Sequence, residues 1–314
     1  MTGPPTKRAV DADEVKARVE GLCLEVPGSI SNLGPGFDAL AVAVQLYLRV
    51  TVRRVDVTTP GRITVSPTHA GDDYIVRGIE TLASREGVEL PGLDLEVESE
   101  IPVQGGLGSS GAAIVAGLVL YDHMTGDAGR DLLAEATRFE GHPDNVAAAL
   151  LGGLTAACVS ASGDVVGLSS AWPEEVRFVT ATPEVRVKTA EARLVVPTEF
   201  SRADAVFNLQ RVALLLQAVH TRRLDAIAEA LADRWHQPYR APLVPGLEEL
   251  LALRHPNLLG VCLSGSGPTV AALCRGETAG VEAAIGETYT RLGLACRVRT
   301  LAAHNGPLRA IERS

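Results

Sequence analysis

The sequence predicts an α+β protein with two domains. Strand-like and helical segments are mixed along the whole chain, and a length of 314 residues is enough for one large domain or two. The two halves also differ in their order of elements. In the second half this order is strand, helices, strand, strand, helix, strand, which is typical of a ferredoxin-like domain.

The first half combines strands with buried helices. Residues 22–26 and 46–58 are predicted strands, and 93–99 (LDLEVES) alternates apolar and acidic residues with the period of a half-exposed strand. Residues 112–121 (AAIVAGLVLY) are apolar on all sides, which predicts a buried helix. Residues 154–160 (LTAACVS) return to the strand pattern. Between these two segments, a second helix is indicated by the one-sided stripe Leu132, Leu133, Ala136 and Phe139.

The second half starts with a predicted strand at 177–183 (RFVTATP). Ser201 and Asp204 form a capping pair that predicts the start of a long helix, because a serine side chain there accepts a free N–H group. The elements that follow are a helix near 222–234, strands at 258–263 and 269–274, a helix near 277–292 and a strand at 295–301.

These elements suggest the domain limits. The stretch 160–175 (SASGDVVGLSSAWPEE) reads as a loop, so we expect domains at 21–170 and 171–314. Residues 1–20 are charged and contain proline, which predicts a flexible N-terminal tail.

Composition excludes several function classes. The net charge of −9 and the lack of a Lys/Arg cluster with interleaved aromatics predict no nucleic-acid partner. No apolar run reaches the roughly 18 residues of a membrane helix, and the N-terminus lacks a signal-peptide core. We therefore expect a cytoplasmic protein without a membrane partner. The five cysteines form no C-x-x-C pair, which favours free thiols over disulfides or a metal site.

Four glycines and two serines lie together at 105–111 (GGLGSSG), between a strand and a buried helix. By letters alone they match G-x-G-x-x-G, but a dinucleotide site needs a parallel strand next, and here a second helix follows. No lysine follows the glycines, which excludes a Walker A loop, and G-x-S-x-G is absent. A helix start with free N–H groups binds anionic oxygens well. A phosphate site and a purely structural turn both remain open on this stretch alone.

Three further loops are rich in glycine or polar residues. They are 27–40 (PGSISNLGPGFDAL), 140–153 (EGHPDNVAAALLGG) and SGSGPT at 264–269. Each alone is compatible with a solvated loop. Together with 105–111 they suggest one cleft for a small polar ligand and a phosphate donor.

The sequence of these loops resembles a known family. PVQGGLGSSGAA at 102–113 is similar to the phosphate loop of the GHMP kinases, a superfamily of small-molecule kinases. PGSISNLGPGFDAL, EGHPDNVAAALLGG and LSGSGPTVAAL, with TAEARLVVP and DAVFNLQR, resemble the homoserine kinases within it. The resemblance implies a two-domain GHMP kinase fold, with an N-terminal domain like ribosomal protein S5 domain 2 and a C-terminal ferredoxin-like domain.

It also implies an activity: ATP-dependent phosphorylation of the side-chain hydroxyl of L-homoserine to O-phospho-L-homoserine, in threonine biosynthesis. ATP and Mg²⁺ would be the cofactors, and family members are commonly homodimers. The alternatives are another GHMP kinase of mevalonate or sugar type, or an inactive nucleotide-binding regulator. Against a mevalonate-type kinase, the acidic Asp38 suits a substrate with an ammonium group.

The resemblance implies roles for individual residues. The ATP phosphates would be bound by Pro102, Gly105, Gly106, Leu107, Gly108, Ser109, Ser110, Gly111 and Ala112. Homoserine would be bound by Asn32, Asp38, His142, Asp144, Thr189, Arg240 and Gly265, with Asp38 facing its ammonium. Asn145, Arg193 and Ser110 would be catalytic, and Ser110 would also contact Mg²⁺. Arginine suits a carboxylate or a phosphate equally, because its planar fork binds either through two hydrogen bonds.

Two positions depart from the family pattern. Some relatives carry a carboxylate at the position of Asn145, and an amide cannot accept a proton at neutral pH. We therefore expect catalysis by positioning and charge neutralisation without a dedicated base, although Asp144 or His142 is a competing base. The Mg²⁺-binding glutamate of some relatives corresponds to Ala134 here. Glu135 and Glu140 are substitutes, and we favour Glu140.

Overall fold

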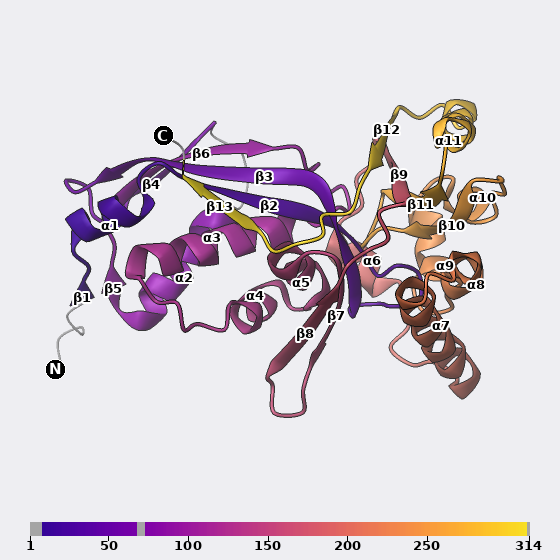
Figure 1. Ribbon diagram of the computed structural model, residues 1–314, viewed down its shortest axis with the longest axis horizontal. Helices are drawn as coiled ribbons and strands as arrows, with labels where there is room; N and C mark the ends of the chain where they lie inside the picture. Colours follow the sequence, from indigo (N-terminus) through magenta and orange to yellow (C-terminus); the bar gives the residue numbers. More distant parts are fainter. Residues whose placement is uncertain (1–7, 68–72, 313–314) are drawn as a thin grey trace.

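Two β-sheets organise the part of the chain that the computed structural model describes, residues 8–67 and 73–312 (Figure 1). The first sheet is built around two long strands, β2 (Leu22–Ser31) and β3 (Leu40–Asp56), which pair antiparallel. Its order is β13 (Arg309–Glu312), β2, β3, β6 (Gly92–Ser99) and β4 (Ile63–Ser66). The strand β7 (Leu154–Val159) also pairs with β3, and β8 (Val165–Ser170) pairs with β7.

Helices cover one face of this sheet (Figure 1). They are α1 (Ala12–Val19), α2 (Tyr74–Glu86), α3 (Ser109–Thr125), α4 (Leu132–Glu140) and α5 (Asp144–Leu151). The helix α3 is buried nearly all round, as its uniformly apolar sequence predicts, and it packs against α2, α4 and α5. The central position of α3 fixes its N-terminus, and with it the glycine loop that precedes the helix.

The second sheet is antiparallel, with the order β10 (Leu258–Leu263), β11 (Val270–Arg275), β9 (Val176–Pro183) and β12 (Cys296–Leu301). The predicted ferredoxin-like order is confirmed. The helices of this half are α6 (Thr189–Leu194), α7 (Arg202–His220), α8 (Ile227–Ala230), α9 (Gln237–Arg240), α10 (Leu247–Leu251) and α11 (Ala279–Arg291). Two 3-10 turns span Leu224–Ala226 and Ala241–Leu243. The Ser201 side chain accepts the Asp204 N–H at the start of α7, as predicted.

The structure differs from the sequence prediction at the N-terminus. A flexible tail is expected over 1–20, but residues 8–20 contain β1 (Arg8–Ala9), which pairs with β5 (Val88–Glu89), and α1. Val15 and Val19 lie four residues apart on one face of α1 and are fully buried. Residues 1–7 lie outside the described part of the chain. Apolar spacing therefore outweighs the charged composition of this segment.

Two further differences concern the predicted domain boundary. The loop predicted at 160–175 contains β8, a short strand (VVGLSS) whose apolar Val166 and Leu168 are exposed and whose glycine and serines are typical of a loop. Near the end of the chain, β13 returns to pair with β2 of the first sheet. The division at 170 and 171 stays a prediction, with residues 309–312 belonging to the first sheet rather than the second.

Two composition-based expectations can be compared with the structure. All five cysteines are free thiols, as expected. Among the described residues, no helix has both the length and the apolar character needed to span a membrane.

Candidate active site

The glycine loop leads directly into the N-terminus of α3. Gly108 is the residue before the first turn, in a left-handed conformation with φ of 75°, and no side chain caps the N–H groups of that turn. A Cβ atom on Gly108 would lie 2.2 Å from the Ser29 Oγ atom, so glycine is required there. Uncapped N–H groups and the positive end of a buried helix form a site for anionic oxygens.

The loop SGSGPT from the second sheet packs against this glycine loop. The Ser264 hydroxyl donates to the Gly106 carbonyl over 2.6 Å, and a Cβ on Gly106 would lie 2.6 Å from the Ser264 carbonyl oxygen. Two loops that are more than 150 residues apart in the chain therefore form one wall. Around Gly106 and Gly108, the other predicted phosphate-loop residues lie in this wall or in the first turn of α3: Pro102, Gly105, Leu107, Ser109, Ser110, Gly111 and Ala112.

Ser110 and Glu140 come together across two helices. The Ser110 hydroxyl, in the first turn of α3, donates a hydrogen bond of 2.6 Å to the Oε1 atom of Glu140, the last residue of α4. Burial raises the pKa of Glu140, and the Asp144 charge acts in the same direction. Glu135 instead forms ion pairs with Arg85 (2.8 Å) and Arg138 (2.9 Å). Of the two substitutes for the missing family glutamate, Glu140 is therefore the one beside the phosphate loop.

The turn after β2 presents Asn32 and Asp38. Both residues adopt positive φ (69° and 55°), a conformation that asparagine and aspartate tolerate better than most residues. The Asn32 side chain accepts the Asp38 N–H over 3.0 Å and donates to the Gly265 carbonyl over 3.0 Å. Asn32 thus holds this turn closed and ties it to the loop of the second sheet.

The start of α5 carries three polar side chains. Asp144 Oδ1 contacts His142 Nδ1 at 2.6 Å and accepts the Asn145 backbone N–H over 2.8 Å. The Asn145 amide donates to Asp144 over 3.2 Å and accepts the Ser29 hydroxyl over 2.8 Å. Burial acts to lower the pKa of His142, but the Asp144 contact and nearby carboxylates outweigh it and raise the pKa. This histidine is therefore a favourable partner for negative charge.

Two arginines from the second half complete the site. Arg193, at the end of α6, binds Asp38 through both Nη atoms (2.9 and 2.8 Å). Arg240, in α9, is buried and donates to the carbonyls of Ala192 (3.0 Å) and Gly265 (2.9 Å). Both guanidinium groups lie over the Phe37 ring. The Asp38 contact raises the pKa of Arg193, whereas burial and the Arg193 charge lower that of Arg240 to about 10.

The structure brings the predicted site residues into one place. Ligand atoms of Asp38, His142 and Asp144 lie within 4.8 Å of one another. Thr189 is at the rim, 3.4 Å from the Ser266 hydroxyl and exposed. One difference concerns Asp38, which we expect to face a substrate ammonium but which is bound by Arg193 here. An incoming ammonium must share this carboxylate with Arg193.

Sequence reasoning missed three residues of this site. Ser29 fixes the Asn145 amide, Phe37 lies under both arginines, and His236 contacts Arg240. Phe37 lies in the motif PGSISNLGPGFDAL, which carries the family resemblance, and it directly precedes Asp38, so the sequence could have indicated it as a site residue. Ser29 lies in the same motif, whereas a single histidine before a short helix carries no comparable signal.

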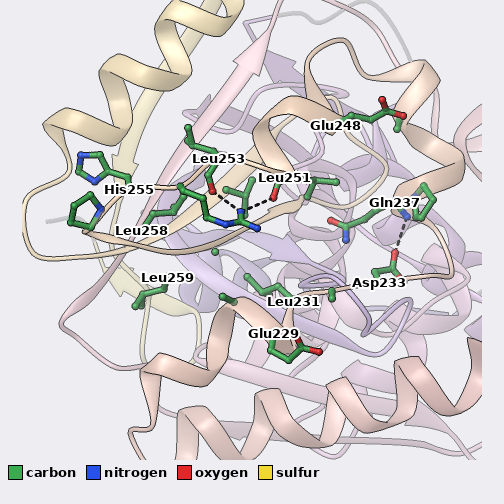
Figure 2. A pocket seen from close by; sticks show the side chains of 18 residues that line it. Glu229, Leu231, Asp233, Gln237, Glu248, Leu251, Leu253, His255, Leu258 and Leu259 are labelled. Carbon is green, nitrogen blue, oxygen red and sulfur yellow. Dashed lines mark hydrogen bonds between the residues drawn. The ribbon is translucent and has the colours of Figure 1, made fainter.

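A cavity of about 910 Å³ lies elsewhere, beside the edge strand β10. Figure 2 shows Asp233 and Gln237 on one side of it and His255 and Leu258 on the other. None of the predicted site residues lines it. It adjoins the candidate active site at α9, whose Gln237 lines the cavity while Arg240 belongs to the site.

Comparison with known proteins agrees with this arrangement. Residues 73–153 match the family described as GHMP kinases N terminal domain, and 215–290 match GHMP kinases C terminal. The chain is 42% identical to a homoserine kinase of Solibacter usitatus over 79% of this chain and 83% of that protein. It is 41% identical to a homoserine kinase of Deinococcus radiodurans, over 88% of this chain and 92% of that one.

The chain belongs to the homoserine kinase family of GHMP kinases. A crystal structure of homoserine kinase from Cytophaga hutchinsonii superposes with a TM-score of 0.78 at 25% identity, covering 93% of this chain and 98% of that one. Mevalonate kinase of Methanococcus jannaschii shares the fold, with a TM-score of 0.63 at 14% identity over 90% and 98% of the two chains. The predicted fold and family are confirmed. As in other GHMP kinases, ATP use follows from membership.

Proposed function

We propose that this homoserine kinase family member transfers the γ-phosphoryl group of ATP to the side-chain hydroxyl of L-homoserine, as its relatives' names imply. The observation that carries the proposal is that acidic and cationic side chains meet in one site, with Arg193 bound directly to Asp38. Asp38 and Asp144 offer negative charge, and Arg193 and Arg240 offer positive charge, next to the N-terminus of α3. An amino acid has this pair of opposite charges, and neither mevalonate nor a sugar has it.

The substrate contacts follow from these charges. Asp38, supported by Asp144, binds the ammonium group, and Asn32 fixes the turn that carries Asp38. His142, Thr189, Arg240 and Gly265 form the rest of the pocket. The ATP phosphates lie on the N–H groups of the glycine loop and the first turn of α3. The predicted homodimer and the cytoplasmic location remain predictions.

The residues near the phosphate loop fit a magnesium ion. Mg²⁺ prefers hard oxygen ligands and binds through one or two protein groups plus substrate phosphates. The Ser110 hydroxyl and the Glu140 carboxylate supply such oxygens 2.6 Å apart, and the buried Glu140 charge would be balanced by a cation. When bound, the ion neutralises charge on the phosphates.

Asn145 orients the attacking hydroxyl. Its amide oxygen is bound by Ser29 and one N–H by Asp144, so the second N–H is left for the substrate oxygen. The hydroxyl oxygen forms a bond to the γ-phosphorus while the bond to the bridging oxygen of ADP breaks. The hydroxyl proton passes to a phosphoryl oxygen late in the step, without a dedicated base. Arg193 stabilises the transferring group.

Replacing Asn145 by aspartate tests this assignment. We expect Asn145→Asp to lower kcat about tenfold or more, because it places a second carboxylate beside Asp144 and removes a hydrogen-bond donor. The measurement is kcat across pH with saturating substrates. A variant much faster than the wild type, with a new acidic pKa in its rate profile, would contradict catalysis without a base.

The experiment that tests the proposed function is ADP release with Mg·ATP across L-homoserine, D-homoserine, L-serine, L-threonine, mevalonate and galactose. We expect a strong preference for L-homoserine. In Asp38→Asn, the KM for L-homoserine should rise about tenfold or more, because the ammonium loses its charged partner, while the KM for ATP stays near the wild type.

Asp225→Asn is the matched control, because Asp225 is an exposed carboxylate that also pairs with an arginine, Arg223. Turnover of mevalonate or a sugar would overturn the pocket assignment. ATP binding without turnover of any alcohol would overturn the proposed activity.

A further inference from the structure

A buried histidine lies between two segments of the proposed substrate pocket. The His236 side chain is completely buried, immediately before α9. Its Nδ1 atom is 3.3 Å from Arg240 Nη1, and its Nε2 atom is 2.7 Å from the Gly34 carbonyl oxygen. Gly34 belongs to the turn that carries Asn32 and Asp38. One imidazole therefore connects the arginine of the second half with the turn of the first.

The chemistry of its partners fixes the tautomer of His236. A guanidinium group only donates hydrogen bonds, so Nδ1 must carry a lone pair toward Arg240. A carbonyl only accepts, so Nε2 must carry the proton toward Gly34. The neutral Nε2–H form satisfies both contacts, whereas a doubly protonated ring would place two donors face to face. Burial lowers the pKa of His236; the Asp233 carboxylate, 3.4 Å from Nε2, acts to raise it and the Arg240 charge acts to lower it, and the net direction is downward.

Asp233 fixes the backbone on which this ring is carried. Its buried carboxylate accepts the backbone N–H groups of Trp235, His236 and Gln237 over 2.7 to 3.0 Å. Asn208 of α7 donates to the same carboxylate over 2.7 Å. The first turn of α9 is therefore rigid at the position of His236, and Phe37 packs on the ring with centroids 5.3 Å apart.

These contacts determine which part of Arg240 is left for a ligand. Nε donates to Ala192, and the two N–H bonds of Nη1 are used by Gly265 and His236. Within residues 8–67 and 73–312, Arg240 Nη2 donates no hydrogen bond, so its two N–H groups remain available to a ligand. The hydrogen bond to the His236 imidazole is thus one of three that fix the orientation of the Arg240 guanidinium group.

We propose that His236 is a positioning residue: its Nδ1 atom holds Arg240 so that Arg240 Nη2 meets the anionic group of the substrate, while the Nε2–H bond to Gly34 serves to set the tautomer of the ring. This inference rests on the proposed function. It assigns His236 a role in substrate binding through Arg240, without contact with the reacting atoms.

Two variants separate the two bonds of the ring. In His236→Asn the amide lies at the level of Nδ1, so its oxygen still accepts from Arg240 while the Gly34 bond is lost. In His236→Gln the amide lies at the level of Nε2, so it still donates to Gly34 while the acceptor for Arg240 is lost. We expect His236→Gln to raise the KM for L-homoserine about tenfold, with the KM for ATP within about twofold of the wild type. His236→Asn should stay within about threefold of the wild type.

A double-mutant cycle shows whether the effect passes through Arg240. In an Arg240→Lys background, His236→Gln should change the KM for L-homoserine by less than about twofold. The proposal would be overturned if His236→Asn and His236→Gln raised the KM for L-homoserine equally, or if His236→Gln kept the wild-type KM. It would also be overturned if the effects of His236→Gln and Arg240→Lys on this KM were fully additive. Unchanged ATP binding in each variant shows that the fold is retained.

The tautomer provides a test without turnover. Nitrogen-15 NMR of histidine-labelled wild-type protein should show one neutral Nε2–H ring that does not titrate between about pH 6 and 8, assigned by its loss in His236→Asn. An Nδ1–H or charged ring would overturn the proposal whatever the kinetics of the two variants. If the wild type turns over another alcohol, the proposed function fails, and the kinetic tests are repeated with that alcohol.

Discussion

Replacing Arg193 by alanine is expected to lower kcat for L-homoserine phosphorylation about a thousandfold, while the KM for ATP changes little. An arginine that stabilises a transferring phosphoryl group contributes about 10³ to 10⁵ in kcat. Arg193 is the more exposed member of the arginine pair, with 38% of its side chain accessible, and within the described part of the chain its side-chain hydrogen bonds go to Asp38. In the proposed function, the ATP phosphates are held by backbone N–H groups of the glycine loop and the first turn of α3, which do not involve Arg193.

Arg193→Lys separates charge from geometry in the same position. Lysine keeps the positive charge but lacks the planar fork, so we expect a loss of about 10- to 100-fold. Arg186→Ala, an exposed arginine seven residues earlier, is the control and should be near the wild type. The measurement is steady-state kinetics with both substrates varied. A large rise in the KM for L-homoserine with kcat unchanged would make Arg193 a binding residue instead.

The fold could be predicted where a local pattern determines local structure. The uniformly apolar segment at 112–121 and the alternation at 93–99 each correspond to an element of the expected kind, α3 and β6. The pattern failed where long-range contacts decide. The strand β13 forms only because β2 has a free edge, and β8 only because β7 precedes it at hairpin distance. Neither segment carries the apolar alternation by which strands are recognised.

The site could be predicted because glycine-rich loops and their motifs are local in sequence. The resemblance placed Asp38, Asn145 and Arg240 in one pocket, and the structure brings them together. Which side chains contact each other within the pocket could not be predicted in the same way. That Arg193 binds Asp38, or that His236 reaches Gly34, depends on how two halves of the chain pack, with separations of more than 150 residues. These contacts are also the ones that carry mechanistic detail beyond the family pattern.

Glu140 illustrates how the structure resolves a choice that the sequence left open. By resemblance, Ala134 stands where some relatives have a Mg²⁺-binding glutamate, and both Glu135 and Glu140 lie within six residues of it. The two carboxylates are on α4, but Glu135 is neutralised by Arg85 and Arg138, whereas Glu140 faces the Ser110 hydroxyl. Burial destabilises the charged form of a carboxylate that is bonded to a hydroxyl alone, and a bound cation would offset this cost.

We therefore expect Glu140→Gln to lower kcat about a hundredfold at a fixed Mg²⁺ concentration and to raise the Mg²⁺ concentration for half-maximal rate about tenfold. The amide keeps the size of the side chain and its hydrogen bond with Ser110 but removes the charge. Glu135→Gln is the matched control on the same helix and should leave the Mg²⁺ dependence unchanged. The measurement is initial rate against free Mg²⁺ at saturating ATP and L-homoserine. If Glu140→Gln showed the Mg²⁺ dependence of the wild type while Glu135→Gln lost it, the assignment of the metal carboxylate would be reversed, and the Ser110–Glu140 contact would be a helix-packing hydrogen bond alone.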